Sequence, residues 1–79
     1  MKKIIDTTVI ADNVRWLRKN LLRETQEEFA EHIDASKDTV SNIERCRVVP
    51  KMETLLKISA YTGVPLEELL GIAQRRERV

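Results

Sequence analysis

The sequence has 79 residues, 42% of them hydrophobic, and a formal net charge of +1. A chain of this length can build one compact core, and it leaves little room for a buried catalytic cavity. The single Cys46 and the single His32 exclude an intramolecular disulfide and are too few for a structural zinc site. We therefore expect one domain that is not an enzyme and that uses no metal or other cofactor.

The apolar residues are dispersed along the chain. No uninterrupted apolar run approaches the roughly 20 residues that a membrane span requires. The first residues, MKKIIDTTVIADN, lack the continuous apolar segment and the cleavage site of a secretion signal. From the sequence we expect a cytoplasmic protein that has no membrane partner.

The charge is distributed unevenly. Lys and Arg outnumber Asp and Glu by six to two in residues 1–23 and by four to two in residues 35–51, whereas residues 24–34 hold five acids and no base. Segregation of this kind can present a basic face to phosphates although the total charge is near zero. An ordinary solvated surface would produce such a charge pattern about as often as a phosphate-binding face would.

Strand signals are nearly absent from the sequence, and the exception lies in the N-terminal segment. The β-branched residues between Ile4 and Val9 favour an extended arm, so we expect an arm over residues 1–8. A helix follows, because apolar residues at spacings of four, three and four form one stripe that faces a core. These residues are Ile10, Val14, Leu17 and Leu21.

A second helix is predicted from a capping box. Thr25 is followed three residues later by Glu28, and in this motif each side chain satisfies a free backbone N–H at the start of a helix. The second helix should therefore begin at Gln26. Its inward residues are Phe29, Ala30 and Ile33.

A third helix should follow after a very short break. Ser36 offers an N-cap, and Asp38 complements the positive end of the helix dipole. The helix should run from about Ser36 to Arg45 with Val40 and Ile43 inward. It should end near Cys46, because the following segment is β-branched and reaches Pro50, which disfavours helix before it.

The remaining sequence predicts two more helices. The helical period returns over Lys51 to Thr62 and stops at Gly63, and Pro65 opens a last short helix before Gly71. A basic tail occupies residues 72–79. The residues expected on the buried faces are Met52, Leu55, Leu56 and Ser59 in the fourth helix and Leu66, Leu69 and Leu70 in the fifth.

Residues 26–45 have the pattern of two helices that cross steeply. Ala30 is small where the third helix passes over it, and Ile33, Val40 and Ile43 fill the angle between the two helices. The segments TQEEFAEHI, SKDTVSNIE and PKMETLLKISAYTGVPLEELLG resemble the lambda-repressor-like domains of the Cro and XRE transcriptional-regulator family. The resemblance covers roughly Ile10 to Gly71.

The resemblance implies an all-α, five-helix fold in which the second and third helices form a helix-turn-helix, here within residues 9–71. It implies sequence-specific binding to double-stranded DNA by a transcriptional regulator, usually a repressor or activator that works as a homodimer on paired half-sites. Carried over by position, it implies base-facing or phosphate-contacting roles for a set of residues in the second and third helices. These are Gln26, Ser36, Lys37, Asp38, Ser41 and Asn42.

The chemistry of these side chains fits such roles. Lys can donate to guanine, Asn can pair with adenine through two hydrogen bonds, and Asp can accept from cytosine N4. Without the resemblance, Lys37 and Asp38 would more often be a solvated first turn, and Ser36 would be only a cap. Three cations near the end of the third helix are candidate phosphate contacts, with an even chance of being merely solvated. They are Arg45, Arg47 and Lys51.

Glu44 follows Ile43 in a pair that family members usually keep, and the resemblance implies that its carboxylate pairs with a base of the first helix. Arg18 is the candidate partner, and we interpret this pair as structural. The sequence departs from the family pattern at Asp34 and Cys46, where glycine is usual, and in the linker LLRET, which is one residue longer and lacks its glycine. A turn at Asp34 should need positive φ.

Two alternatives remain at this stage. The first is a protein-interaction module or antitoxin of the same fold, with Leu69, Leu70 and Ile72 at an interface and with DNA binding subordinate. The second is a small hydrolase that uses Cys46 and His32. The second is remote, because the two lie in different predicted helices and no third residue obviously orients the imidazole.

Overall fold

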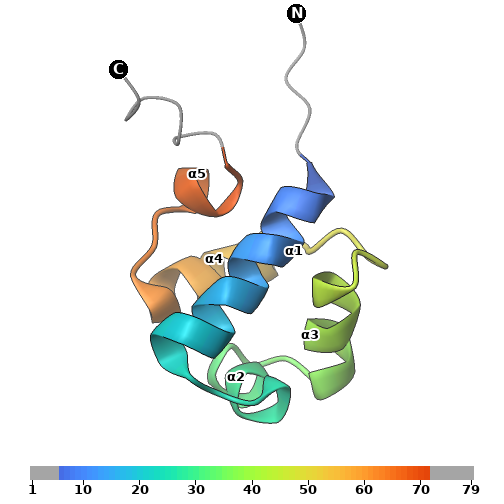
Figure 1. Ribbon diagram of the computed structural model, residues 1–79, viewed down its shortest axis with the longest axis vertical. Helices are drawn as coiled ribbons and strands as arrows, with labels where there is room; N and C mark the ends of the chain where they lie inside the picture. The colour runs from blue at the N-terminus through green and yellow to red at the C-terminus, as the bar shows by residue number, and fades with distance from the viewer. Residues whose placement is uncertain (1–5, 72–79) are drawn as a thin grey trace, which may run out of the picture.

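The computed structural model describes residues 6–71, and these residues form helices joined by short turns (Figure 1). No strand occurs among these described residues, so the prediction of an all-α fold with five helices is confirmed. The first helix continues from an α-helical part into a π-helical part. The elements are α1 (Thr7–Trp16), η1 (Leu17–Leu22), α2 (Gln26–His32), α3 (Lys37–Glu44), α4 (Met52–Thr62) and α5 (Leu66–Leu69).

The first helix begins earlier than the sequence indicated. Asp6 is its N-cap, and its carboxylate accepts a hydrogen bond of 2.9 Å from the backbone N–H of Thr8. This cap outweighs the strand preference of the β-branched residues, so the chain is helical from Thr7, inside the segment expected to be an extended arm. The rest of the expected arm, residues 1–5, and the basic tail, residues 72–79, lie outside the described residues.

The π-helical part changes which leucine is buried. We expected Leu21 on the buried stripe, but its side chain is 52% exposed, and Leu22 packs against the core instead. In a π-helix the hydrogen bonds join residues five apart, so the position after Leu17 on the same face is Leu22. The four-residue spacing used for the prediction therefore failed at this turn.

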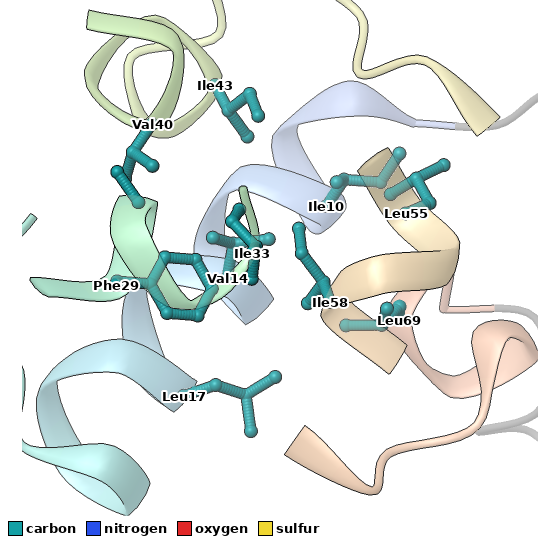
Figure 2. Close-up of a cluster of buried hydrophobic side chains, with 11 residues drawn as sticks. Ile10, Val14, Leu17, Phe29, Ile33, Val40, Ile43, Leu55, Ile58 and Leu69 are labelled. Atoms are coloured by element: carbon teal, nitrogen blue, oxygen red, sulfur yellow. The ribbon is translucent and has the colours of Figure 1, made fainter. Parts of the chain in front are cut away.

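The core is a single cluster of side chains drawn from every α-helix (Figure 2). Side chains of α1, Ile10 and Val14 among them, lie between those of α2 and α3 on one side and those of α4 and α5 on the other. Phe29 of α2 is fully buried in this cluster. Each large side chain buried in this way contributes about 1.5–3 kcal/mol, so α3 rests on a rigid support.

The buried face of α4 is narrower than predicted. Leu55 and Ile58 are buried, but Met52 and Leu56 are 54% and 51% exposed, so the expectation that these two face the core is wrong. In so small a domain only one side of α4 has helices packed on it, and the apolar positions beside that stripe remain in solvent. α4 ends as predicted at Gly63, whose φ is +80°.

The last helix, α5, packs against α1 and α4. Leu69 is fully buried, and Leu66 and Leu70 are partly buried against the core, as predicted. Because Leu69 has no exposed surface, the interface suggested for it in the protein-interaction alternative is wrong, and Ile72 lies outside the described residues. Among residues 6–71 no helix is long and apolar enough to cross a membrane.

Candidate nucleic-acid interface

The start of α2 is fixed by the predicted capping box. The hydroxyl of Thr25 accepts from the backbone N–H of Glu28 at 3.1 Å, and the Glu28 carboxylate accepts from the backbone N–H of Thr25 at 2.9 Å. Two N–H groups that a helix start would leave free are therefore paired. The prediction that α2 begins at Gln26 is confirmed.

The turn between α2 and α3 is a Schellman motif built on Asp34. The N–H of Ala35 donates to the carbonyl of Ala30 at 2.8 Å, and the N–H of Asp34 donates to the carbonyl of Glu31 at 3.2 Å. Asp34 has a φ of +58°, so the predicted left-handed conformation is present without glycine. This motif fixes the direction in which the chain enters α3.

The same motif ends α3. The N–H of Arg47 donates to the carbonyl of Asn42 at 2.8 Å, and the N–H of Cys46 donates to the carbonyl of Ile43 at 3.1 Å. Cys46 has a φ of +60°, and the linker residue Arg23 has a φ of +56°. The two usual glycine positions and the linker that lacks its glycine thus each contain a left-handed residue with a side chain.

α3 presents a polar face to solvent and an apolar face to the core. Ser36 is its N-cap, as predicted, and accepts from the N–H of Thr39 at 3.1 Å. At about 100° per residue, the outward positions from 37 to 45 share an arc of roughly 140°, opposite the buried Val40 and Ile43. On this arc Lys37, Asp38 and Arg45 are exposed, and Ser41 and Asn42 are partly exposed.

The side chains of the base-facing candidates form no polar contacts within the described part of the domain. Within residues 6–71 no hydrogen bond or ion pair engages the side chains of Lys37, Asp38, Ser41 or Asn42. Their donors and acceptors are therefore available to a ligand. The structure brings these four together with Arg45 on one surface of one helix.

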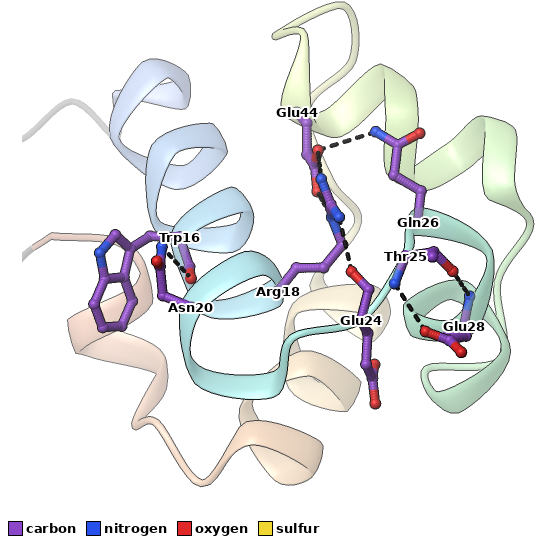
Figure 3. Close-up of polar contacts among 8 residues, drawn as sticks. All are labelled: Trp16, Arg18, Asn20, Glu24, Thr25, Gln26, Glu28 and Glu44. Atoms are coloured by element: carbon purple, nitrogen blue, oxygen red, sulfur yellow. Dashed lines mark hydrogen bonds and ion pairs between the residues drawn. The ribbon is translucent and has the colours of Figure 1, made fainter.

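A largely buried polar network connects η1, α2 and α3 (Figure 3). The Arg18 guanidinium donates to both carboxylate oxygens of Glu44, at 2.7 and 3.0 Å, and to the carbonyl of Glu24 at 2.8 Å. The predicted Arg18–Glu44 pair is confirmed, and Glu44 is only 4% exposed. A bidentate pair of this kind fixes the angle between its helices better than a single contact would.

Gln26 also belongs to this network, which the sequence did not indicate. Its side-chain N–H donates to Glu44, the last residue of α3, at 3.0 Å, and Gln26 remains partly exposed. Glu44 therefore orients the amide of Gln26. The signal available in the sequence was the acceptor capacity of Glu44, because a carboxylate paired with one arginine retains lone pairs for a further donor.

The three candidate phosphate contacts of the sequence lie at the end of α3 and in the segment that follows it. Arg45, Arg47 and Lys51 are all exposed, and Lys51 stands at the start of α4 without a side-chain cap. A groove of about 390 Å³ lies between α3, this segment and α4. Val49, 69% exposed on the rim of that groove, was not singled out from the sequence.

The family model for the helix-turn-helix matches residues 14–69. The chain belongs to this family. The match runs from the last turn of α1 through α5, and it supports the lambda-repressor-like, XRE-type identification. No curated protein and no solved structure matches the chain. The helix-turn-helix family comprises DNA-binding regulatory domains and not enzymes, so the chain is a DNA-binding domain of the transcription-regulator type.

A second polar cluster in this helix-turn-helix protein lies away from α3. The Tyr61 hydroxyl donates to Glu24 at 2.5 Å and lies 2.8 Å from Nδ1 of His32. The hydrogen bond to Glu24, together with burial, raises the pKa of Tyr61 to about 12. Cys46 has a different neighbour, because its thiol donates to the carbonyl of Thr7 at 3.7 Å. The His32 and Cys46 side chains thus belong to separate clusters.

Proposed function

We propose that the protein is a sequence-specific repressor that binds double-stranded DNA as a homodimer and reads the major groove with the helix at residues 36–45. The observation that carries this proposal is the outward arc of α3, where four polar side chains without partners among the described residues lie opposite two fully buried anchors. The major groove of B-DNA is wide enough to admit one α-helix.

The first part of the proposal concerns base recognition. Lys37 would donate to guanine O6 and N7, and Asp38 would accept from cytosine N4. Asn42, one turn further along the arc, would pair with adenine N6 and N7, and Ser41 would contact either a base or a phosphate. A good bidentate contact discriminates by about 1–3 kcal/mol against the wrong base, so these contacts would set the half-site sequence.

The second part concerns the DNA backbone. Gln26 would reach a phosphate from the start of α2, held in place by Glu44, and Ser36 would do so from the start of α3. Arg45, Arg47 and Lys51 would contact phosphates on the flank of the groove. These residues would give affinity without sequence preference.

The third part concerns the biological effect. Repression requires only that the bound domain occupies DNA that a polymerase needs, and no further chemistry. We place this activity in the cytoplasm, on DNA half-sites related by the twofold axis of the dimer. A dimer of this kind reads half-sites whose centres lie about 34–36 Å apart.

The test is selection of binding sequences from random duplexes, followed by affinity measurements over a range of salt concentrations. We expect a short, twofold-symmetric sequence and an affinity that falls steeply and log-linearly with salt. Replacing Arg47 by Gln should reduce the salt slope and weaken all duplexes equally, because a phosphate contact carries no base preference. Weak binding without sequence preference, together with tight binding of a purified protein partner, would favour the protein-interaction alternative.

A further inference from the structure

Trp16 is the only tryptophan of the chain, and it is 58% exposed. It lies in the last turn of α1, and Figure 3 shows it on the side of this helix opposite to Arg18. Scattered exposed apolar residues are normal on protein surfaces. A tryptophan is a special case, because it is enriched among the residues that dominate the binding energy of interfaces.

Two hollows flank Trp16, and its side chain forms the ridge between them. The first lies between α1 and α5, has a volume of about 170 Å³ and includes the apolar side chains of Leu17 and Val64 in its lining. The second lies on the other side of Trp16, on α1 and the start of η1, with a volume of about 380 Å³. A ridge beside an apolar hollow is a shape that can interlock with a copy of itself.

The net charges of the two hollows that flank Trp16 have opposite signs. Glu68 lies on the rim of the first hollow, where Asn13 holds the end of α5 by donating to the carbonyl of Leu69 at 2.9 Å. The second hollow is lined by Arg15, Lys19 and Asp12, so two bases outweigh one acid there and its net charge is positive. A twofold axis through this surface would set the basic side of one copy against the acidic side of the other, as an isologous interface requires.

We propose that this Trp16 face, formed by Trp16 and the two hollows, binds a second copy of the chain. The indole of each copy enters the hollow between α1 and α5 of the other, and Arg15 of each copy faces the partner's Glu68. This inference supplies an interface for the proposed homodimer and rests on that proposal for its function. The self-association itself can be measured without DNA.

The interface is expected to be weak. Two aromatic side chains contribute about 300 Å² at its centre, whereas stable complexes bury about 1,200–2,000 Å² in total. Association should therefore depend on protein concentration in the free state. Paired half-sites on one duplex raise the effective concentration of the second copy, so the dimer should form most completely on DNA.

Trp16 provides its own probe, because the intrinsic indole fluorescence of the protein comes from this one residue. We would measure the emission maximum and the sedimentation of the full chain over a dilution series. We expect the emission to move to shorter wavelength as the sedimenting mass rises toward that of a dimer. The DNA-bound protein should show the same shift.

Four variants and a matched control locate the contact. Glu68→Arg and Arg15→Glu should each weaken self-association by roughly tenfold or more, and the double variant should recover much of the loss because the two charges exchange places. Trp16→Ala should abolish cooperative occupancy of paired half-sites and leave binding to a single half-site unchanged. Leu56→Ala, a change at an apolar residue of similar exposure on α4, is the matched control and should change neither quantity.

Several results would overturn this inference. They are a chain that stays monomeric both free and on DNA, a dimer that forms while the emission of Trp16 stays constant, and a Trp16 that is covered only by a different protein. Each of these leaves the proposal of DNA recognition by α3 standing. Failure of the native chain to bind any selected duplex would refute DNA recognition and leave the dilution series interpretable.

Discussion

Replacement of Cys46 by glycine should stabilise the protein. Cys46 ends α3 with a φ of +60°, in a Schellman motif that glycine occupies without a steric penalty. A left-handed conformation costs an ordinary residue about 1–2 kcal/mol. The extra freedom of glycine in the unfolded chain cancels about 0.4–1 kcal/mol of that gain. The lost thiol contact is long, at 3.7 Å, and exposed, so it changes the balance little.

The net gain should be about 0.5–1 kcal/mol, which corresponds to a rise in Tm of about 2–8 °C for a domain of this size. Thermal unfolding followed by circular dichroism under reducing conditions measures it. Cys46→Ser is the matched control, because it removes the thiol but keeps a side chain at the same φ, and its Tm should stay near that of the native protein. Equal melting temperatures for the glycine and serine variants would refute the reasoning.

Three further predictions follow from the network and the turns. Asp34→Gly should also raise Tm without loss of DNA affinity. The rise should be smaller than for Cys46→Gly, because aspartate tolerates positive φ and Asp34 pairs with Lys57 at 3.2 Å. A lower Tm would count against the turn geometry. Glu44→Gln should lower the free energy of unfolding, measured in urea, by about 3–5 kcal/mol, because it leaves the largely buried charge of Arg18 without its partner. An unchanged urea midpoint would show that the network is dispensable. The absorbance of the only tyrosine, Tyr61, should titrate near pH 12 in the folded protein and near pH 10.0 in denaturant. The free energy of unfolding should therefore fall as the pH rises from 10 to 12. Equal titration midpoints in the two states would contradict the hydrogen bond to Glu24.

The sequence predicted those features that depend on local chemistry. The capping box at Thr25 and the cap at Ser36 each rest on a few adjacent residues, and the structure confirms both. The left-handed turn at Asp34 is also confirmed, but it was expected because the family usually has glycine at this position. The Arg18–Glu44 pair joins residues far apart in the chain and was predicted only through the resemblance to a family.

The errors arose where packing decides between neighbouring positions. Leu21 and Leu22 are the same residue type, and only the π-helical hydrogen bonding determines which of them enters the core. Met52 and Leu56 have the period of a buried face, but no helix among the described residues covers them. The start of the first helix was missed because the cap at Asp6 opposes the local strand preference.

The candidate DNA-contacting residues form a separate case. The sequence placed Lys37, Asp38 and Asn42 on one face, and the structure leaves that face open. The bond from the Gln26 amide to Glu44 was missed, because the spare acceptor capacity of Glu44 does not show which donor the packing of α2 on α3 brings to it.

The most direct test of the central claim is a comparison of Asn42→Ala with the native protein on the selected duplex and on duplexes altered at one base pair at a time. If α3 reads the major groove, the variant should lose preference at one base pair in each half-site, by about 1–3 kcal/mol, and keep it at the others. A variant that keeps the full preference of the native protein at every base pair, or that weakens all duplexes equally, would contradict the account.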